Sequence, residues 1–211
     1  MSETQSNIKE QPLEKHKASH DFADEAAIIR RCCEGESAAF EVLVRRYQDR
    51  IFRMAFGLLG SYADAEEVTQ EVFLKAFEKL GTFRQKSSFY TWLFRIATNE
   101  ALTHRRQKKR VSFFSIFAGK DDDPPGDLPN KKQPQPDRPM IENENIIAVR
   151  NALSKLDMDF RTVVVMRDME NMNYNEISQV LGIPVGTVKS RISRARLMLR
   201  NLLVDVVRND S

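Results

Sequence analysis

Apolar residues recur at steps of three and four along two stretches of the chain, about residues 21–110 and 141–208. This period places them on one face of an α-helix. No segment alternates polar and apolar residues over strand length, so the pattern predicts an all-α fold. The expected helices cover about residues 24–33, 38–59, 63–80, one beginning near 87 or 88, 142–155, 159–169, 174–181 and 184–200.

Capping residues and buried stripes support these helices. Ser37 is the expected N-cap of the helix that ends before Gly60, and Asn173 with Glu176 forms an expected capping pair. The apolar residues expected to face inward on the 63–80 helix and the helix that follows it are Val68, Val72, Ala76, Leu80, Phe89, Trp92, Leu93 and Ile96.

A Pro-rich segment divides the chain. Six of the eight prolines lie between Pro124 and Pro139, in a run with almost no apolar residues, which is typical of a flexible linker. We therefore expect two small helical domains, the C-terminal one a helix-turn-helix. The expected boundaries are a disordered tail at 1–20, a domain at 21–110, a linker at 111–140 that begins with the apolar run 111–117, and a domain at 141–211.

Composition and residue spacing limit the cellular location and the cofactors that we expect for the chain. No run approaches the roughly 20 apolar residues of a membrane span, and residues 1–20 lack the apolar centre of a secretory signal, so we expect a cytoplasmic protein without membrane insertion. Cys32 and Cys33 are adjacent, which excludes an internal disulfide framework and favours burial against a neighbouring helix. No His, Cys, Asp and Glu residues have the spacing of a zinc site, so neither a metal nor a cofactor is expected.

The net charge of +3 is unevenly distributed. Between Arg84 and Arg110 eight basic residues face one acid, and aromatic residues are interleaved with them. This combination suits single-stranded nucleic acid, because basic groups bind phosphates while aromatic faces receive unstacked bases. The alternative is that the aromatic residues belong to the core and the charges form a solvated face.

The helix before it is acidic, with five acids against one lysine between Asp64 and Glu78. Such a surface repels DNA and suits a protein partner, although an ordinary solvated helix face has the same composition.

The C-terminal stretch has the order of a helix-turn-helix: a short helix, Gly182 and Ile183 at the turn, and a longer helix that begins at Pro184. Basic residues on the second helix meet no acid before Asp205. A recognition helix of this kind reads bases in the major groove with its N-terminal part. A basic helix without a nucleic-acid role is the alternative.

No catalytic motif accompanies these features. The sequence contains neither a glycine-rich phosphate loop nor a GxSxG motif, and the adjacent Glu66 and Glu67 point to different sides of a helix. We therefore do not expect an enzyme. A second alternative, an enzyme acting on nucleic acid, would need metal ligands or a general base, and the sequence offers no plausible set of residues for either.

Three segments carry a family resemblance. Asp64-AEEVTQEVFLKAF-Glu78, Ser88-FYTWLFRIATN-Glu100 and Leu181-GIPVGTVKSRISRAR-Leu197 closely resemble bacterial RNA polymerase sigma factors of the extracytoplasmic function (ECF) group. The resemblance covers about residues 24–110 and 141–205 and implies promoter-specific transcription initiation without catalysis. The partners it implies are core RNA polymerase, promoter DNA and an inhibitory anti-sigma protein.

The resemblance also implies roles for individual residues. The acidic helix would dock on the polymerase largest subunit through Asp64, Glu67, Gln70, Glu71 and Leu74. The next helix and its preceding loop would melt the minus 10 promoter element through Phe83, Lys86, Arg95, Asn99, Arg105 and Arg106. In the helix-turn-helix, the residues implied to contact the minus 35 element are Tyr174, Thr187, Lys189, Ser190, Arg191, Ser193, Arg194 and Arg196.

One other function fits the same motif. A stand-alone helix-turn-helix regulator would bind duplex DNA without polymerase, normally as a dimer on a two-fold operator. It would leave the acidic helix and the basic segment 84–110 without a role. The sequence does not identify the target promoters, the inducing signal, or the roles of the tail and of the run 111–117.

Overall fold

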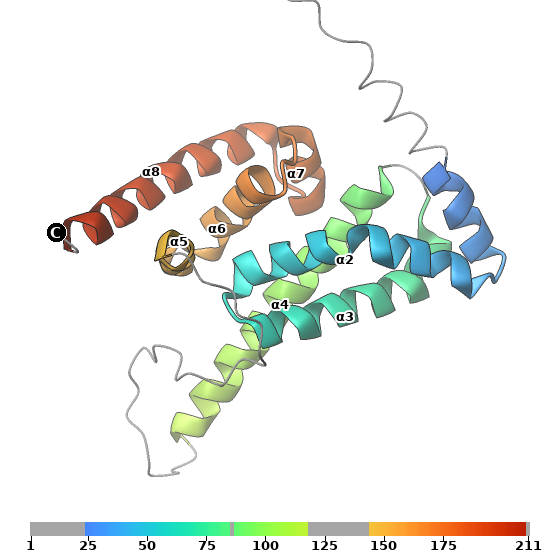
Figure 1. Ribbon diagram of the computed structural model, residues 1–211, viewed down its shortest axis with the longest axis horizontal. Coiled ribbons are helices and arrows are strands. Elements are labelled where there is room, and N and C mark those ends of the chain that lie inside the picture. The colour runs from blue at the N-terminus through green and yellow to red at the C-terminus, as the bar shows by residue number, and fades with distance from the viewer. Residues whose placement is uncertain (1–23, 85–86, 118–143, 210–211) are drawn as a thin grey trace, which may run out of the picture.

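The computed structural model describes residues 24–84, 87–117 and 144–209, with only the backbone for 112–117, 144–145 and 205–209. The secondary structure within these ranges is helical, as the sequence predicts (Figure 1). The expected tail 1–20, most of the expected linker and Lys86 lie outside the described residues. None of the helices in the described ranges has the length and hydropathy needed to cross a bilayer.

The N-terminal domain is a small helical bundle. A helix at residues 24–33 precedes α2 (Ser37–Leu59), α3 (Tyr62–Lys79), the short 3₁₀ helix η1 (Leu80–Thr82) and α4 (Phe89–Phe117). Figure 1 shows α2 and α3 side by side with α4 crossing behind them, and each of these helices contacts the other two.

Burial of one apolar face of each helix stabilises this domain. Val68, Val72 and Ala76 of α3 are fully or nearly fully buried, as are Phe89 and Leu93 of α4. The predicted inward faces of these helices are therefore confirmed. Trp92 and Ile96 are only half-buried at the edge of the core.

A hydrogen bond anchors the first helix to this bundle. The buried phenol of Tyr47 on α2 donates to the carboxylate of Glu25. Burial, and then the neighbouring Glu25 carboxylate, raise the pKa of Tyr47, so the phenol keeps its proton.

The C-terminal domain consists of α5 (Glu144–Lys155), α6 (Met158–Val164), the π-helical turn η2 (Val165–Met169), α7 (Tyr174–Leu181) and α8 (Val185–Asn209). Gly182 has φ of 66°, the left-handed conformation that glycine adopts without strain. Its backbone N–H donates to Ser178 O at 2.8 Å, which ends α7 and turns the chain into α8.

Several helix boundaries differ from the expectation. Ser37 is the first residue of α2, and Glu36 occupies the N-cap position, so the expected Ser37 cap is wrong. The expected 159–169 helix is split, because the backbone changes to π-helical hydrogen bonding at Val165. The backbone of α4 stays helical to Phe117, within the range assigned to the linker.

The cysteines are less buried than expected. Cys32 is half-buried and Cys33 is exposed, because the helix at 24–33 covers the core with Ile28 and Ile29 instead. Burial, followed by the neighbouring Cys33, raises the pKa of the Cys32 thiol and so lowers its reactivity.

The two domains contact each other through α2 and α4 on one side and α5, α6, η2 and α7 on the other. The buried guanidinium of Arg161 on α6 donates to Leu58 O at 2.8 Å, near the end of α2, and to Leu156 O at 3.2 Å. Burial lowers the pKa of Arg161 to about 10, so the side chain remains charged at neutral pH.

The capping box at the start of α7 provides a stability test. Asn173 Oδ1 accepts from the backbone N–H of Glu176 at 3.0 Å, and Glu176 Oε2 accepts from the N–H of Asn173 at 2.7 Å. We expect Asn173→Ala to lower the free energy of unfolding by about 1 kcal/mol, because the backbone N–H groups of Asn175 and Glu176 both lose their acceptor, Asn173 Oδ1. Urea unfolding followed by circular dichroism measures this, and the exposed neighbour Asn175→Ala is the control. Equal stability of the two variants would contradict the role of the cap.

Candidate nucleic-acid interface

The aromatic residues around the start of α4 form one cluster. The ring of Phe83 lies 5.4 Å from that of Trp92 and 5.8 Å from that of Phe89, centroid to centroid. Phe89 and Phe94 are fully buried, whereas Phe83, Tyr90 and Trp92 are half-buried. The core explanation of the aromatic residues is therefore correct for Phe89 and Phe94, and three partly exposed rings remain beside the basic residues of α4.

The polar residues of α4 implied in minus 10 contact point away from the core. Asn99 and Arg106 are exposed, and Arg106 Nε also donates to Leu102 O of its own helix at 3.2 Å. Arg95 and Arg105 reach the other domain instead, since Arg95 Nη2 donates to Gln179 O and Arg105 Nη1 contacts Met158 Sδ. The arrangement thus leaves some of this basic surface open and covers part of it.

The acidic face of α3 is open along most of its length. Gln70 is exposed, and the side chains of Glu67 and Glu71 are 66% and 51% exposed. Leu74 is 59% exposed beside Phe77, which is 49% exposed and packs edge-on against Phe40 at 5.1 Å. Sequence reasoning did not single out Phe77. The signal that would have identified it in the sequence is a large apolar residue on the acidic side of the helix, away from the predicted inward face.

Asp64 differs from the other acids of this face because it is mostly buried. Lys108 Nζ of α4 lies 2.8 and 2.6 Å from the two carboxylate oxygens of Asp64. His104 Nε2 is 3.2 Å from Asp64 Oδ1 but is buried without a hydrogen bond of good geometry, so Lys108 is the main partner. Burial opposes ionisation of Asp64, but the hydrogen bonds from Lys108 and, to a lesser extent, the nearby imidazole of His104 outweigh it and lower the pKa of Asp64.

The same contacts bring potential metal ligands together. Asp64, Glu67 and His104 offer ligand atoms within 4.8 Å of one another, at the side of a polar cavity of about 250 Å³ between α3 and α4. Residue spacing along the chain did not indicate this cluster, because its members come from two helices. Lys108 already neutralises the Asp64 carboxylate, which reduces the attraction of the cluster for a cation.

In the helix-turn-helix, α8 places its predicted base-reading residues outward. Val188, Ile192 and Ala195 are buried against the domain core, which turns the intervening residues toward solvent. The exposed side chains in this part of α8 include those of Lys189, Ser190, Ser193 and Arg194.

The predicted phosphate contacts of this domain are partly engaged within it. Arg191 pairs with Asp159 at 2.5 Å, and Arg196 forms two hydrogen bonds with Asp168. The half-buried ring of Tyr174 has Arg167 at 5.1 Å and Lys189 Nζ at 5.8 Å from its centroid. Thr187 is half-buried, and its carbonyl accepts from Ser190 Oγ at 3.0 Å.

Comparison with known proteins decides the family. The Sigma-70 region 2 model matches residues 43–111, and the Sigma-70 region 4 model matches residues 146–199. The chain is 36% identical to the RNA polymerase sigma-H factor of Pseudomonas aeruginosa over 86% of this chain and 94% of that protein. It is 35% identical to the ECF RNA polymerase sigma-E factor of Haemophilus influenzae over 83% of this chain and 93% of that protein. The chain belongs to the ECF sigma factors.

Solved structures of similar proteins share the fold. CnrH, solved in complex with the cytosolic domain of CnrY, is 26% identical and aligns with a TM-score of 0.62 over 85% of this chain and 96% of that one. The sigma factor RpoE of Bartonella quintana, solved in complex with the anti-sigma factor NepR, is 24% identical with a TM-score of 0.60 over 78% and 96% of the two chains. In this ECF sigma factor, α2–α4 thus correspond to region 2 and α5–α8 to region 4.

The pairing of Asp64 with Lys108 predicts a pH dependence. A lowered pKa means that ionised Asp64 stabilises the folded state above the pKa that it has when unfolded, and that this stabilisation is lost as the pH falls through its folded pKa. We expect Lys108→Gln to raise the pKa of Asp64, measured by NMR titration of the carboxyl carbon. Lys109→Gln changes an exposed neighbour and is the control, and the same Asp64 pKa in both variants would contradict the assignment.

Proposed function

We propose that this ECF sigma factor binds core RNA polymerase and directs promoter-specific initiation, with region 2 melting the minus 10 element and region 4 binding the minus 35 element. The observation that carries the proposal is the separation of charge over two domains: an open acidic face on α3, and basic surfaces on α4 and α8. Tethering two weak DNA contacts raises the effective concentration of the second, so together they select one promoter. We place this activity in the cytoplasm.

In region 2, the polymerase would dock on Asp64, Glu67, Gln70, Glu71 and Leu74. The exposed Leu74 and Phe77 support this, because an apolar centre within a charged rim is typical of a protein interface. Phe83 and Asn99 would line the pocket for a flipped non-template base, with Lys86, Arg95, Arg105 and Arg106 on the backbone. Unstacking a base costs a few kcal/mol, so the exposed side of the Phe83–Trp92 cluster suits its capture.

In region 4, Lys189, Ser190, Ser193 and Arg194 would face base edges, and their exposure on one side of α8 supports this assignment. Tyr174, Thr187, Arg191 and Arg196 would lie near phosphates. The ion pairs of Arg191 and Arg196 fix the direction of both guanidinium groups before DNA arrives, which reduces the entropy lost on binding.

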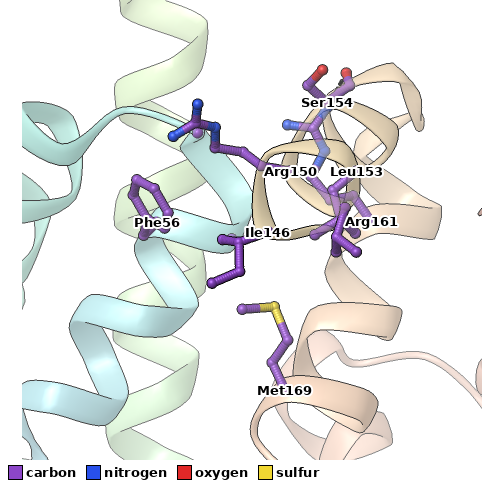
Figure 2. A pocket seen from close by; sticks show the side chains of 10 residues that line it. Phe56, Ile146, Arg150, Leu153, Ser154, Arg161 and Met169 are labelled. Carbon is purple, nitrogen blue, oxygen red and sulfur yellow. Dashed lines mark hydrogen bonds between the residues drawn. The ribbon is translucent and has the colours of Figure 1, made fainter. Parts of the chain in front are cut away.

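We also propose an anti-sigma protein as a partner, as the family resemblance implies. An apolar cavity of about 300 Å³ at the junction of the two regions supports it. Figure 2 shows Phe56 of α2 on one side of the cavity, facing Ile146 of α5 and Met169 of η2 on the other. Ile146 and the neighbouring Val149 are almost half exposed, so an apolar side chain of a partner would bury them.

Transcription with core polymerase tests the function. We expect run-off transcripts with new, sequence-specific starts when the protein is added to sigma-free core polymerase and a genomic promoter library. Glu71→Arg should reduce these transcripts by roughly tenfold or more, because like charges would face each other at the interface. Glu41→Arg makes the same charge change on an exposed acid of α2 and should leave transcription unchanged. Sequence-specific duplex binding without any transcripts would instead favour the stand-alone regulator.

Two arginines of α8 should behave differently. We expect Arg194→Ala to weaken binding to a minus 35 duplex by about 1 to 3 kcal/mol and to relax sequence preference at one position, because a base contact is lost. Arg196→Ala should weaken binding to every sequence and lower the salt dependence by about one phosphate contact. A promoter-variant binding series at several salt concentrations measures both, and identical profiles of the two variants would contradict the distinction.

A further inference from the structure

The apolar cavity between the two regions also has a basic part. Its volume of about 300 Å³ is at the lower end of the range for small-molecule sites. Phe56 of α2, Ile146 of α5 and Met169 of η2 belong to its apolar lining. In Figure 2, the side chains of Arg150 and Arg161 end above those of Ile146 and Met169. The cavity therefore offers different chemistry at its two ends.

Close packing of the two regions forms the walls beside this cavity. The side chain of Glu170, which follows η2, is fully buried, and its carboxylate lies 3.1 Å from Arg50 Nε and 3.3 Å from Arg53 Nε of α2. Gly57 of α2 lines the cavity, and a Cβ atom at this position would lie 3.0 Å from a methyl group of Val165 in η2. A larger residue at position 57 would thus push the walls apart.

Arg161 contributes a buried positive charge to the lining of the cavity. The residue is only 3% exposed, and its Nε is buried without a hydrogen-bond partner. Its two Nη atoms donate to backbone oxygens near the ends of α2 and α5. Within the described residues, Arg161 forms no ion pair and the cavity lining includes no acid. Because a buried charge is costly unless it is paired, this guanidinium favours an anion.

Other basic groups lie near Arg161. Burial, followed by the nearby charge of Arg105 on α4, lowers the pKa of Arg161 to about 10. Arg150 of α5 lines the same cavity. The surroundings of Arg161 therefore disfavour a cation. A carboxylate suits the free Nε donor, because hydrogen bonds between charged groups are stronger than those between neutral ones.

The rest of the cavity is apolar and reaches the surface. Ile146 and Val149 line it and are 47% and 45% exposed, so a small molecule can enter from solvent. Burial of an aliphatic chain against these side chains is favourable. A sugar or a nucleotide would leave hydroxyl groups without partners on the same wall. The volume limits an aliphatic chain to medium length.

We propose that this cavity binds a medium-chain aliphatic acid, whose carboxylate accepts from Arg161 Nε and whose chain lies against Phe56, Ile146 and Met169. This inference goes beyond the proposed function, because the site requires neither polymerase nor DNA. A bound acid fills the space that we assign to an apolar side chain of the anti-sigma protein, so the two ligands exclude each other.

Calorimetric titration of the full chain with decanoate tests the site. We expect saturable binding of one decanoate per chain. Decanol has the same chain without the charge, and butyrate has the charge with a much shorter chain. Both should bind about tenfold more weakly or worse, because each loses one half of the recognition. Binding of decanoate that does not saturate, or equal binding of decanol, would overturn the proposal.

Substitutions locate the bound acid. Ile146→Trp enlarges a nearly half-exposed side chain of the cavity and should weaken decanoate binding by about tenfold or more. Its control is Val42→Trp, at an exposed apolar residue of α2 outside the cavity. Arg161→Met removes the charge and should have an effect of about the same size. Its control is Arg167→Met, which removes another arginine of region 4 that donates to a backbone oxygen.

Two further measurements separate loss of the site from misfolding. Unchanged helical circular dichroism identifies the variants that fold. In the unchanged chain, decanoate should shift the NMR signal of the Met169 methyl group but not that of Met54, which is buried in the core of region 2. If Arg161→Met does not fold, Ile146→Trp and the decanol comparison still decide. Undiminished binding to folded Ile146→Trp, or an unshifted Met169 signal, would overturn the proposal.

Discussion

Burial of one stripe on each helix decides which surfaces this protein presents. On α4, Phe89, Leu93 and Ala97 pack against α2 and α3, and the 3.6-residue period then turns Arg95 and Asn99 outward. On α8, Val188 and Ile192 do the same for the residues proposed to read bases. The functional surfaces are therefore consequences of the core.

Charges of opposite sign lie on neighbouring helices that share one core. The acidic face of α3 and the basic face of α4 are adjacent, and the ion pairs of Asp64 with Lys108 and of Glu100 with Lys75 join them at their boundary. A protein partner on the acidic face, which repels DNA, and DNA on the basic face can thus bind the same small domain side by side. Separation of the signs keeps each partner on its own face.

The junction between the regions combines two kinds of contact. Close approach at Gly57 and the donation of Arg161 to the end of α2 depend on shape, whereas Glu170 depends on charge. An apolar cavity remains beside them, lined from both regions. A partner that fills this cavity would contact both regions at once.

The sequence alone predicted the all-α class, most of the helices and their inward faces, because periodicity and capping are local properties of the chain. It also identified the family through three ordered motifs. It was wrong about the Ser37 cap, because the helix begins one residue earlier than expected. It was also wrong about the burial of Cys33, because tertiary packing turns Ile28 and Ile29 of the same helix toward the core instead. The grouping of Asp64 with His104 and the pairing of Glu170 with Arg50 were decided only by tertiary structure. Their members lie 40 and 120 residues apart in the chain, and no local pattern records which distant side chains will neutralise one another.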